Sequence, residues 1–327
     1  MYDCLKLISH KDRVTRARSL PLSSASLNRG NKCKAVALSS STIMSATPLT
    51  NQDTVPATIK YSVPPKDGSQ AHRHTLTDPV TGLAEKNFEE EHMGVTVENV
   101  RGQEHLYSLN RTGFQFCEHP TKMRASDFRD DEKVKEEYYP ESIQFIKDVT
   151  GASRVVIFDH TRRAHRPDEL ETSSDRRQPV SLAHVDQTTA ASITRVRRHI
   201  PEEADSLLKR RFQIINLWRP IENPALDWPL ALCDFRSVDI ESDLFPVTTI
   251  FPTHVGETMA VKHNPKHQWK YQRGMTPDEA VLIKCFDSIQ DGSVAILTPH
   301  TGFQDPTTPL GTPLRESIEL RALVFYD

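Results

Sequence analysis

The spacing of two histidines and one aspartate constrains this chain more than any other feature of its sequence. His184 and Asp186 lie two residues apart, and His300 follows much later in the chain. Side chains at positions i and i+2 of an extended segment point to the same side of the backbone. A second histidine from a distant strand would complete a 2-His-1-carboxylate face, which holds one metal ion and leaves the opposite coordination positions open. The pattern therefore predicts a mononuclear metal site of the kind used by non-haem Fe(II) oxygenases.

An isolated His-x-Asp arises by chance in many proteins, so the other histidines are rival candidates for metal ligands. Asp159 and His160 form the best rival pair, but adjacent residues of a strand point to opposite faces. His254, His263 and His267 have no carboxylate two residues later. The first triad is therefore preferred.

The distribution of apolar residues and prolines indicates a β-rich fold. The 327 residues include 22 prolines and only 12 glycines, which favours a loop-rich β protein over a helical bundle. Apolar or alternating segments predict strands over residues 58–63, 154–158, 212–219, 230–235, 256–263, 268–272, 293–300 and 316–326. We therefore expect a mainly β protein with flanking helices, built as a double-stranded β-helix (a jelly-roll, cupin-like barrel).

Three helices and two long loops complete the expected fold. One helix begins at Pro140 and ends at Gly151, and a short one begins at Pro201 and ends near Arg211. The sequence Thr276-Pro277-Asp278-Glu279 has the pattern of a capping box, which predicts a third helix over residues 279–286. The polar residues 66–103 and 161–180 are expected to be loops.

Charge divides the chain into two parts. Residues 1–43 carry eight Lys/Arg and two Asp, a net of +6, which leaves 33 basic and 42 acidic residues for positions 44–327, a net of −9. We expect residues 1–43 to be a disordered or extraneous basic segment and residues 44–327 to form a single jelly-roll domain. Mitochondrial targeting by the basic segment is the alternative to a cytoplasmic location. The oligomeric state is not predicted.

Composition also bears on the partners of the protein. The mildly acidic body argues against nucleic-acid binding, which needs a basic surface. There is no run of 18 apolar residues, so membrane spanning is not expected. A small-molecule substrate is the partner that the metal site favours.

The last predicted strand has a charged face. Arg315, Ser317, Glu319 and Arg321 alternate with mostly apolar residues and therefore share one side. Such a face is costly to bury unless its charges are engaged. If it lines the barrel, Arg315 can bind the carboxylate of a 2-oxo acid in a two-bond fork while Ser317 donates a hydrogen bond. Arg321 could reach the same carboxylate or neutralise Glu319. A solvated face of an edge strand is the alternative.

Several further residues are candidates for contact with the substrate. Asn216 and Trp218 share one face of a predicted strand, Arg236 and Lys262 could bind a substrate carboxylate, and His160 follows a buried strand. Each also has a structural alternative, either packing in the core or pairing with a neighbouring charge.

From about Met44 to Asp327 the sequence resembles the fungal hydroxylase/desaturase family that includes the gibberellin desaturase and the aspergillic-acid pathway hydroxylase. The matching stretches are Arg111–Phe114, Tyr138–Glu141, Phe158–Thr161, Ala183–Gln187, Asn216–Pro220, Cys233–Ser237, Met275–Glu279, Lys284–Ser288, Pro299–Phe303 and Arg315–Glu319. The resemblance implies an Fe(II)/2-oxoglutarate-dependent oxygenase of fungal secondary metabolism with dioxygen as a cosubstrate. It also implies His184, Asp186 and His300 as iron ligands and places Arg315 and Ser317 on 2-oxoglutarate.

The family does not fix the outcome of the reaction, because its members hydroxylate, desaturate or cyclise small-molecule intermediates. Two other functions stay open at this point. One is a metal-dependent enzyme on the same barrel that does not use 2-oxoglutarate. The other is a non-catalytic small-molecule-binding jelly roll.

Overall fold

Two β-sheets form the body of the protein. The computed structural model describes residues 53–78, 81, 84–169, 177–251 and 254–327, and within them one sheet has ten strands and the other has five. In spatial order the large sheet contains β1 (Thr54–Val63), β4 (Glu89–Asn99), β12 (Trp269–Tyr271), β9 (Leu230–Cys233), β14 (His300–Gly302), β7 (His184–Val185), β11 (Val255–Val261), β10 (Leu244–Ile250), β2 (Ala71–Thr77) and β3 (Ala84–Lys86). The small sheet contains β5 (Phe114–Glu118), β13 (Glu279–Asp287), β8 (Phe212–Pro220), β15 (Glu316–Phe325) and β6 (Arg154–Ala164).

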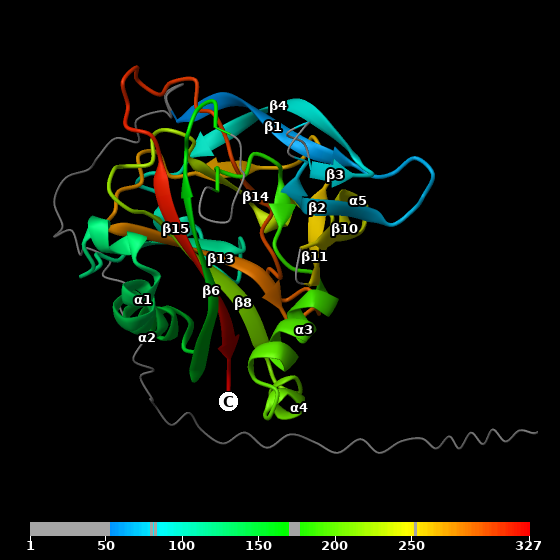
Figure 1. Ribbon diagram of the computed structural model, residues 1–327, viewed down its shortest axis with the longest axis vertical. Coiled ribbons are helices and arrows are strands. Elements are labelled where there is room, and N and C mark those ends of the chain that lie inside the picture. Colours follow the sequence, from blue (N-terminus) through cyan, green and yellow to red (C-terminus); the bar gives the residue numbers. More distant parts are fainter. Residues whose placement is uncertain (1–52, 79–80, 82–83, 170–176, 252–253) are drawn as a thin grey trace, which may run out of the picture. The chain divides into compact units, whose positions relative to one another are not determined.

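Most neighbouring strands are antiparallel, and the chain crosses repeatedly between the two sheets (Figure 1). This arrangement confirms the expected mainly β, double-stranded β-helix. The helices are few and short: α1 (Asp131–Lys133), α2 (Tyr139–Thr150), α3 (Thr189–His199), α4 (Ala204–Leu207) and α5 (Ile240–Asp243), with single helical turns η1 (Glu104–Leu106), η2 (Ala125–Arg129), η3 (Val134–Tyr138) and η4 (Phe235–Ser237).

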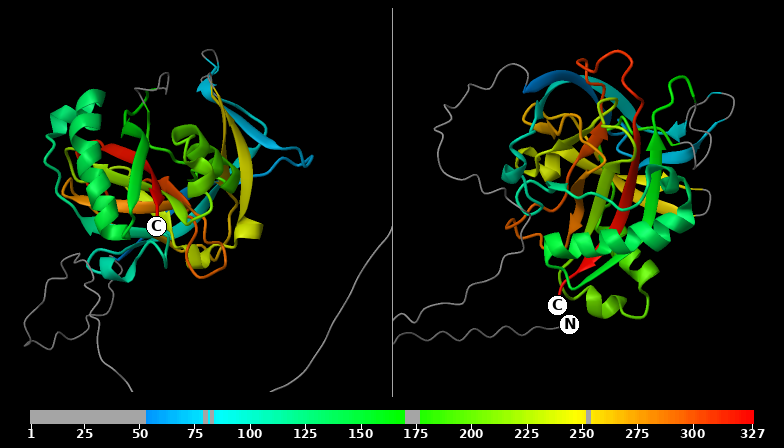
Figure 2. Two further views of the ribbon diagram at one scale, coloured as in Figure 1. Left: turned by 90° about the horizontal axis from the view of Figure 1, so that it is seen from below. Right: turned by 90° about the vertical axis from the view of Figure 1, so that its left-hand side faces the viewer.

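The small sheet is buried on both faces. Its outer face packs Leu217 and Leu320 against Tyr138 and Ile146 of the η3–α2 segment, which runs along this face in Figure 2. Its inner face forms a second apolar cluster with Val196 of α3. Because both faces are covered, β8, β13 and β15 are almost continuously buried, including most of their polar residues.

The helix predicted to begin at Pro140 is confirmed as α2. Gly151, which caps its C-terminal end, has a φ of 71°, the left-handed conformation that glycine adopts without strain. The helix expected from Pro201 is reduced to the single turn α4.

The helix predicted over residues 279–286 is wrong, because this segment is strand β13. The local capping contacts do form: Thr276 N donates to Glu279 Oε2 at 2.8 Å, and Glu279 N donates to Thr276 O at 3.0 Å. The chain then becomes extended, because the following apolar residues pair with β5 on one side and β8 on the other. Pairing and burial in the sheet therefore outweigh the local helix-start signal.

Residues 66–103 were expected to be a loop, and this prediction is also wrong. They contain β2, β3 and β4, and β4 pairs with β1 along ten residues of each strand. The side chains of β4 are mostly polar and partly exposed. Its C-terminal half nevertheless has an alternating apolar face, because Met93, Val95 and Val97 pack into the apolar cluster of the large sheet.

Two strand ends also differ from expectation. β6 continues to Ala164, so residues 161–164 belong to a strand rather than to the predicted loop. Residues 293–299 are irregular, and only His300–Gly302 of the predicted strand pairs in the sheet. Residues 1–43 lie outside the described residues. No helix in the described part of the chain is long and apolar enough to cross a lipid bilayer.

Candidate metal and cosubstrate site

The three predicted metal ligands lie together on the inner side of the large sheet. His184 of β7 and His300 of β14 are direct cross-strand partners, and their ring centroids are 4.5 Å apart. Asp186 directly follows β7, with Oδ1 at 3.3 Å from His184 Nε2. One ligand atom from each residue can be chosen so that all three lie within 4.8 Å of one another. Residues distant in sequence therefore converge on a volume that suits one metal ion.

Each histidine is oriented by a carbonyl two residues earlier in the chain. His184 Nδ1 lies 2.8 Å from Leu182 O, and His300 Nδ1 lies 3.0 Å from Thr298 O. With the proton on Nδ1, each ring keeps the Nε2 lone pair for a metal, which is the usual arrangement of metal-binding histidines. Burial and the neighbouring His184 lower the pKa of His300, which favours the neutral ring. The free Nε2 lone pairs and the neutral His300 ring both suit metal binding.

Asp186 is held ionised. Its Oδ2 accepts hydrogen bonds from Asn216 Nδ2 at 2.7 Å and from Arg321 Nε at 3.2 Å. Burial by itself raises the pKa of Asp186, but Arg321 and the two histidines outweigh burial and hold the pKa well below its ordinary value. A charged carboxylate is thus ready for a cation at neutral pH.

Arg321 is fully engaged by protein groups. Besides Asp186, its guanidinium contacts Glu319 at 2.5 Å, Asp159 at 3.1 Å and Thr161 Oγ1 at 2.8 Å. Burial by itself lowers the pKa of Arg321, but Glu319, Asp186 and Asp159 raise it above its ordinary value. Of the two roles considered from the sequence, pairing with Glu319 is the one the structure contains. These contacts occupy most of the guanidinium donors, and the contact of Arg321 with 2-oxoglutarate suggested by the sequence stays a prediction.

An open space lies beside the triad. Its walls come from both sheets and from the segments that flank them: Thr161, Arg163, Val180, His184, Trp218, Leu230, His300, Thr301, Gly302, Arg315, Ser317, Glu319 and Arg321. The whole charged face predicted for the last strand therefore points into the barrel, as expected.

Arg315 and Ser317 carry unused hydrogen-bond donors in this space. Arg315 donates one NH to Trp228 O, and its backbone N donates to Asp227 Oδ2 at 2.9 Å. Among the described residues, however, neither Arg315 Nε nor Ser317 Oγ has a hydrogen-bond partner, although both atoms are buried. Burial, and then the charge of Arg163, lower the pKa of Arg315 to about 9. An anion at this point would satisfy donors that are costly to leave unpaired.

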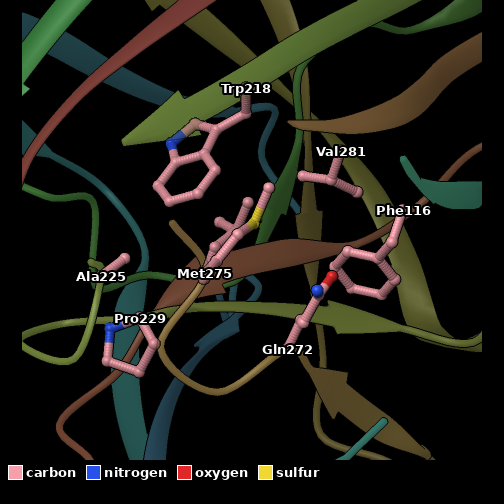
Figure 3. A pocket seen from close by; sticks show the side chains of 8 residues that line it. Phe116, Trp218, Ala225, Pro229, Gln272, Met275 and Val281 are labelled. Carbon is pink, nitrogen blue, oxygen red and sulfur yellow. The ribbon is translucent and has the colours of Figure 1, made fainter. Parts of the chain in front are cut away.

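Trp218 separates this space from a narrower apolar one. The Arg315 guanidinium lies over the Trp218 ring, with its central carbon 5.7 Å from the centre of the ring. On its other side are apolar residues that include Ala225, Met275 and Val281, and in Figure 3 the indole ring lies beside the Met275 side chain. Trp218 therefore forms a wall next to Arg315, at the end of the space that holds the unpaired donors.

Three residues predicted to contact the substrate are not among those that line the space. Arg236, in η4, is paired with Asp234 through contacts of 2.5 and 2.9 Å. Lys262 lies just after β11, where its backbone N donates to Asp243 O. His160 lies on the outer face of β6, with Nδ1 at 2.8 Å from the Tyr139 hydroxyl and Nε2 at 3.3 Å from Asp131. The side chains of Arg236 and His160 therefore have structural partners, and a substrate contact for any of the three residues stays a prediction.

β6 contributes residues to the site that were not predicted from the sequence. Asp159 and Thr161 contact Arg321, and Thr161 and Arg163 line the space. The three residues alternate along the chain and share one side of the strand. This alternation was present in the sequence but overlooked, because the predicted strand ended at Phe158.

A double-stranded β-helix with two histidines and one aspartate at its mouth, and a buried arginine beyond them, defines the class of non-haem Fe(II) oxygenases that use a 2-oxo acid. Comparison with known proteins agrees. The family model described as "Oxidoreductase/YMDC permease-like domain" matches residues 59–325. The hydroxylase/desaturase efuI of Hormonema carpetanum is 35% identical over 254 residues, covering 71% of this chain and 83% of the relative.

A second relative has both a sequence match and a solved structure. The Fe(II)/2-oxoglutarate-dependent dioxygenase nvfI of Aspergillus novofumigatus is 30% identical over 269 residues, covering 80% of this chain and 94% of the relative. The solved structure of the iron and alpha-ketoglutarate-dependent endoperoxidase NvfI matches with a TM-score of 0.75 and 28% identity over 84% of this chain and 99% of that chain. The chain therefore belongs to the family of fungal hydroxylase/desaturases and Fe(II)/2-oxoglutarate-dependent dioxygenases of secondary metabolism.

Proposed function

We propose that His184, Asp186 and His300 bind one Fe(II) ion and that Arg315 and Ser317 bind the distal carboxylate of 2-oxoglutarate. The observation that carries the proposal is the pair of buried, unpartnered donors on Arg315 and Ser317, in the same space as the triad. A guanidinium fork and a hydroxyl are matched to a carboxylate. The alternative of a metal enzyme without 2-oxoglutarate leaves these donors unexplained.

The donor set also fits the metal. Two neutral imidazoles and one carboxylate suit Fe(II) and leave further coordination positions open for small molecules. When bound, Fe(II), 2-oxoglutarate and dioxygen supply the oxidising chemistry that attacks an unactivated C–H bond. The protein's own residues orient the ligands, hold Asp186 ionised, and place Trp218 and Arg315 around the cosubstrate.

The proposed activity is hydroxylation, desaturation or cyclisation of a small-molecule intermediate of fungal secondary metabolism. The endoperoxidase NvfI shows that a related barrel supports yet another oxidation. Residues 44–327 form the single catalytic domain of this proposal, and a cytoplasmic location is proposed for the enzyme. The domain division is supported by the family match over residues 59–325 and by the basic segment 1–43, which lies outside that match.

Anaerobic titration tests the proposal without knowledge of the substrate. The metal-free protein is titrated with Fe(II) and then with 2-oxoglutarate, and visible absorption is followed for the charge-transfer band of an iron–2-oxo acid chelate. We expect one equivalent of each ligand to be bound. Fe(II) binding without the band would favour the metal enzyme that does not use 2-oxoglutarate. Absence of Fe(II) binding would favour the non-catalytic binding protein. In a subsequent substrate screen, succinate release coupled to oxidation identifies turnover.

A further inference from the structure

We infer that Asn216 and Arg321 are positioning residues, which fix Asp186 so that only one of its two oxygens is available to the metal. This inference rests on the proposed role of Asp186 as a metal ligand. It replaces the substrate and cosubstrate contacts that the sequence suggested for Asn216 and Arg321.

The two donors approach the same carboxylate oxygen from the opposite sheet. Asn216 of β8 and Arg321 of β15 are direct register partners in the small sheet, whereas Asp186 follows β7 of the large sheet. Both donors reach Oδ2, at 2.7 and 3.2 Å, while Oδ1 lies 3.3 Å from His184 Nε2. Rotation of the carboxylate would break both hydrogen bonds, so Oδ1 is kept on the side of the histidines.

The amide of Asn216 can have only one orientation at this site. The side chain is fully buried, and its Oδ1 has no hydrogen-bond partner among the described residues. The reversed amide would place that oxygen against the ionised Asp186 and would lose the one hydrogen bond that the side chain makes within the described part of the chain. A buried amide with an unused acceptor is costly. Its charge-assisted bond to Asp186 is the contact that offsets this cost.

Arg321 fixes the same oxygen through a wider network. Its guanidinium touches three carboxylates, those of Asp186, Glu319 and Asp159, and also the Thr161 hydroxyl. These contacts use all three nitrogens of the planar group, so its position is set from several directions. A lysine at this position would keep the charge but not this geometry.

The test is the affinity of the metal-free protein for Co(II), followed by its visible absorption in competition with a chelator. Asn216→Leu removes the hydrogen bond without changing charge and with little change in side-chain volume. Loss of a group that orients a metal ligand commonly costs ten- to a hundredfold in metal affinity. We therefore expect Asn216→Leu to weaken Co(II) binding by about tenfold or more.

Gln213→Leu is the matched control. Gln213 is buried on the same strand, and its Nε2 donates to the carboxylate Oδ2 of Asp287 at 2.7 Å, the same bond length as between Asn216 and Asp186. Neither Gln213 nor Asp287 lines the metal space. Gln213→Leu should lower the melting temperature and leave the Co(II) affinity within about twofold of wild type, in contrast to the metal-site variant.

Arg321→Lys provides a second variant if Asn216→Leu does not fold. It should weaken Co(II) binding while the affinity for 2-oxoglutarate, measured at saturating Co(II), stays within about threefold, because the Arg321 guanidinium is already paired with three carboxylates. Wild-type Co(II) affinity in the folded Asn216 or Arg321 variant would overturn the inference. Loss of 2-oxoglutarate binding in Arg321→Lys at saturating Co(II) would also overturn it. A wild-type protein that binds neither Co(II) nor 2-oxoglutarate would instead refute the proposed function.

Discussion

Arg315, just before β15, and Arg321, within β15, lie on the same side of the chain but have opposite surroundings. Among the described residues no carboxylate pairs with the Arg315 guanidinium, and burial lowers its pKa to about 9. Arg321 contacts three carboxylates, which raise its pKa above the ordinary value despite burial. The first guanidinium can take up an anion, and the second is already neutralised. This difference supports the proposed roles of Arg315 at the cosubstrate and of Arg321 at Asp186.

Replacement of Arg315 by lysine tests the cosubstrate assignment. Arg315→Lys keeps the charge but loses the two-bond fork, and hydrogen bonds to charged groups are worth roughly 1.5–3 kcal/mol. We expect the affinity for 2-oxoglutarate to fall about ten- to a hundredfold. Fe(II) affinity should change little, and Ser317→Ala should weaken 2-oxoglutarate less. Anaerobic titration of the charge-transfer band measures these effects. Normal 2-oxoglutarate binding by Arg315→Lys would remove this residue from the cosubstrate site.

Replacement of any metal ligand by alanine should abolish turnover and the charge-transfer band. For His184→Ala and His300→Ala the fold should persist, because each ring is held mainly by one bond to a nearby carbonyl. Asp186→Ala also leaves Arg321 with fewer acceptors, so a larger loss of stability is expected there. Circular dichroism and melting temperature separate folding from binding. A fully active His300→Ala variant would show that the metal is bound elsewhere.

The position of the chain segment that leads to His300 depends on a glycine just before β5. Gly113, just before β5, has a φ of 88°, and its carbonyl accepts a hydrogen bond from Thr298 Oγ1 at 2.7 Å. A Cβ atom at Gly113 would lie 2.7 Å from Leu297 O and closer still to the Thr298 hydroxyl. Thr298 in turn holds the His300 ring through its carbonyl. The irregular segment before β14 therefore has its position set by β5.

Gly113→Ala should therefore disturb both stability and metal binding. Overlap with Leu297 and Thr298 adds about 1–3 kcal/mol to the cost of a left-handed alanine. Gly151→Ala is the control, because Gly151 also has a positive φ but its added Cβ would meet nothing within 4 Å. Chemical denaturation should show the larger loss for Gly113→Ala, and only this variant should bind Co(II) more weakly. Equal losses in the two variants would show that backbone conformation alone matters.

At the scale of the whole molecule, the site joins the two sheets. The proposed metal ligands belong to β7, the residue after it and β14 of the large sheet, whereas Arg315 and Ser317 lie at the start of β15 in the small sheet. The hydrogen bonds from Asn216 and Arg321 to Asp186 also connect the small sheet to the large one. A cosubstrate bound to both the metal and Arg315 would span the sheets, so the site depends on their relative placement.

Removal of residues 1–43 tests the proposed domain division. The strands and apolar clusters of both sheets are built from Thr54 onward. A chain that begins at Met44 should therefore keep its melting temperature within a few degrees and bind Fe(II) and 2-oxoglutarate as the full chain does. Differential scanning calorimetry and the anaerobic titration provide the comparison. A large drop in melting temperature would show that the basic segment contributes to the stability of the barrel.

Much of the site was accessible from the sequence, because two-residue periodicity is a local property of an extended backbone. It placed His184 beside Asp186, and it placed Arg315, Ser317, Glu319 and Arg321 on one face. The same periodicity held for Asp159, Thr161 and Arg163 and was missed only because β6 was ended too early. Strands β8 and β15, in which more than half of the residues are apolar, were equally visible.

The tertiary structure decided which of these local faces meet. The turn at Thr276–Glu279 forms its capping contacts and still leads into a strand, because β5 and β8 offer pairing on both sides. The polar β4 is a strand because β1 lies beside it. The partners of Asn216 and Arg321 follow from the register of β8 with β15 and the approach of the opposite sheet. Hydrogen-bond pairing and burial act between residues far apart in the chain, so local sequence patterns do not specify them.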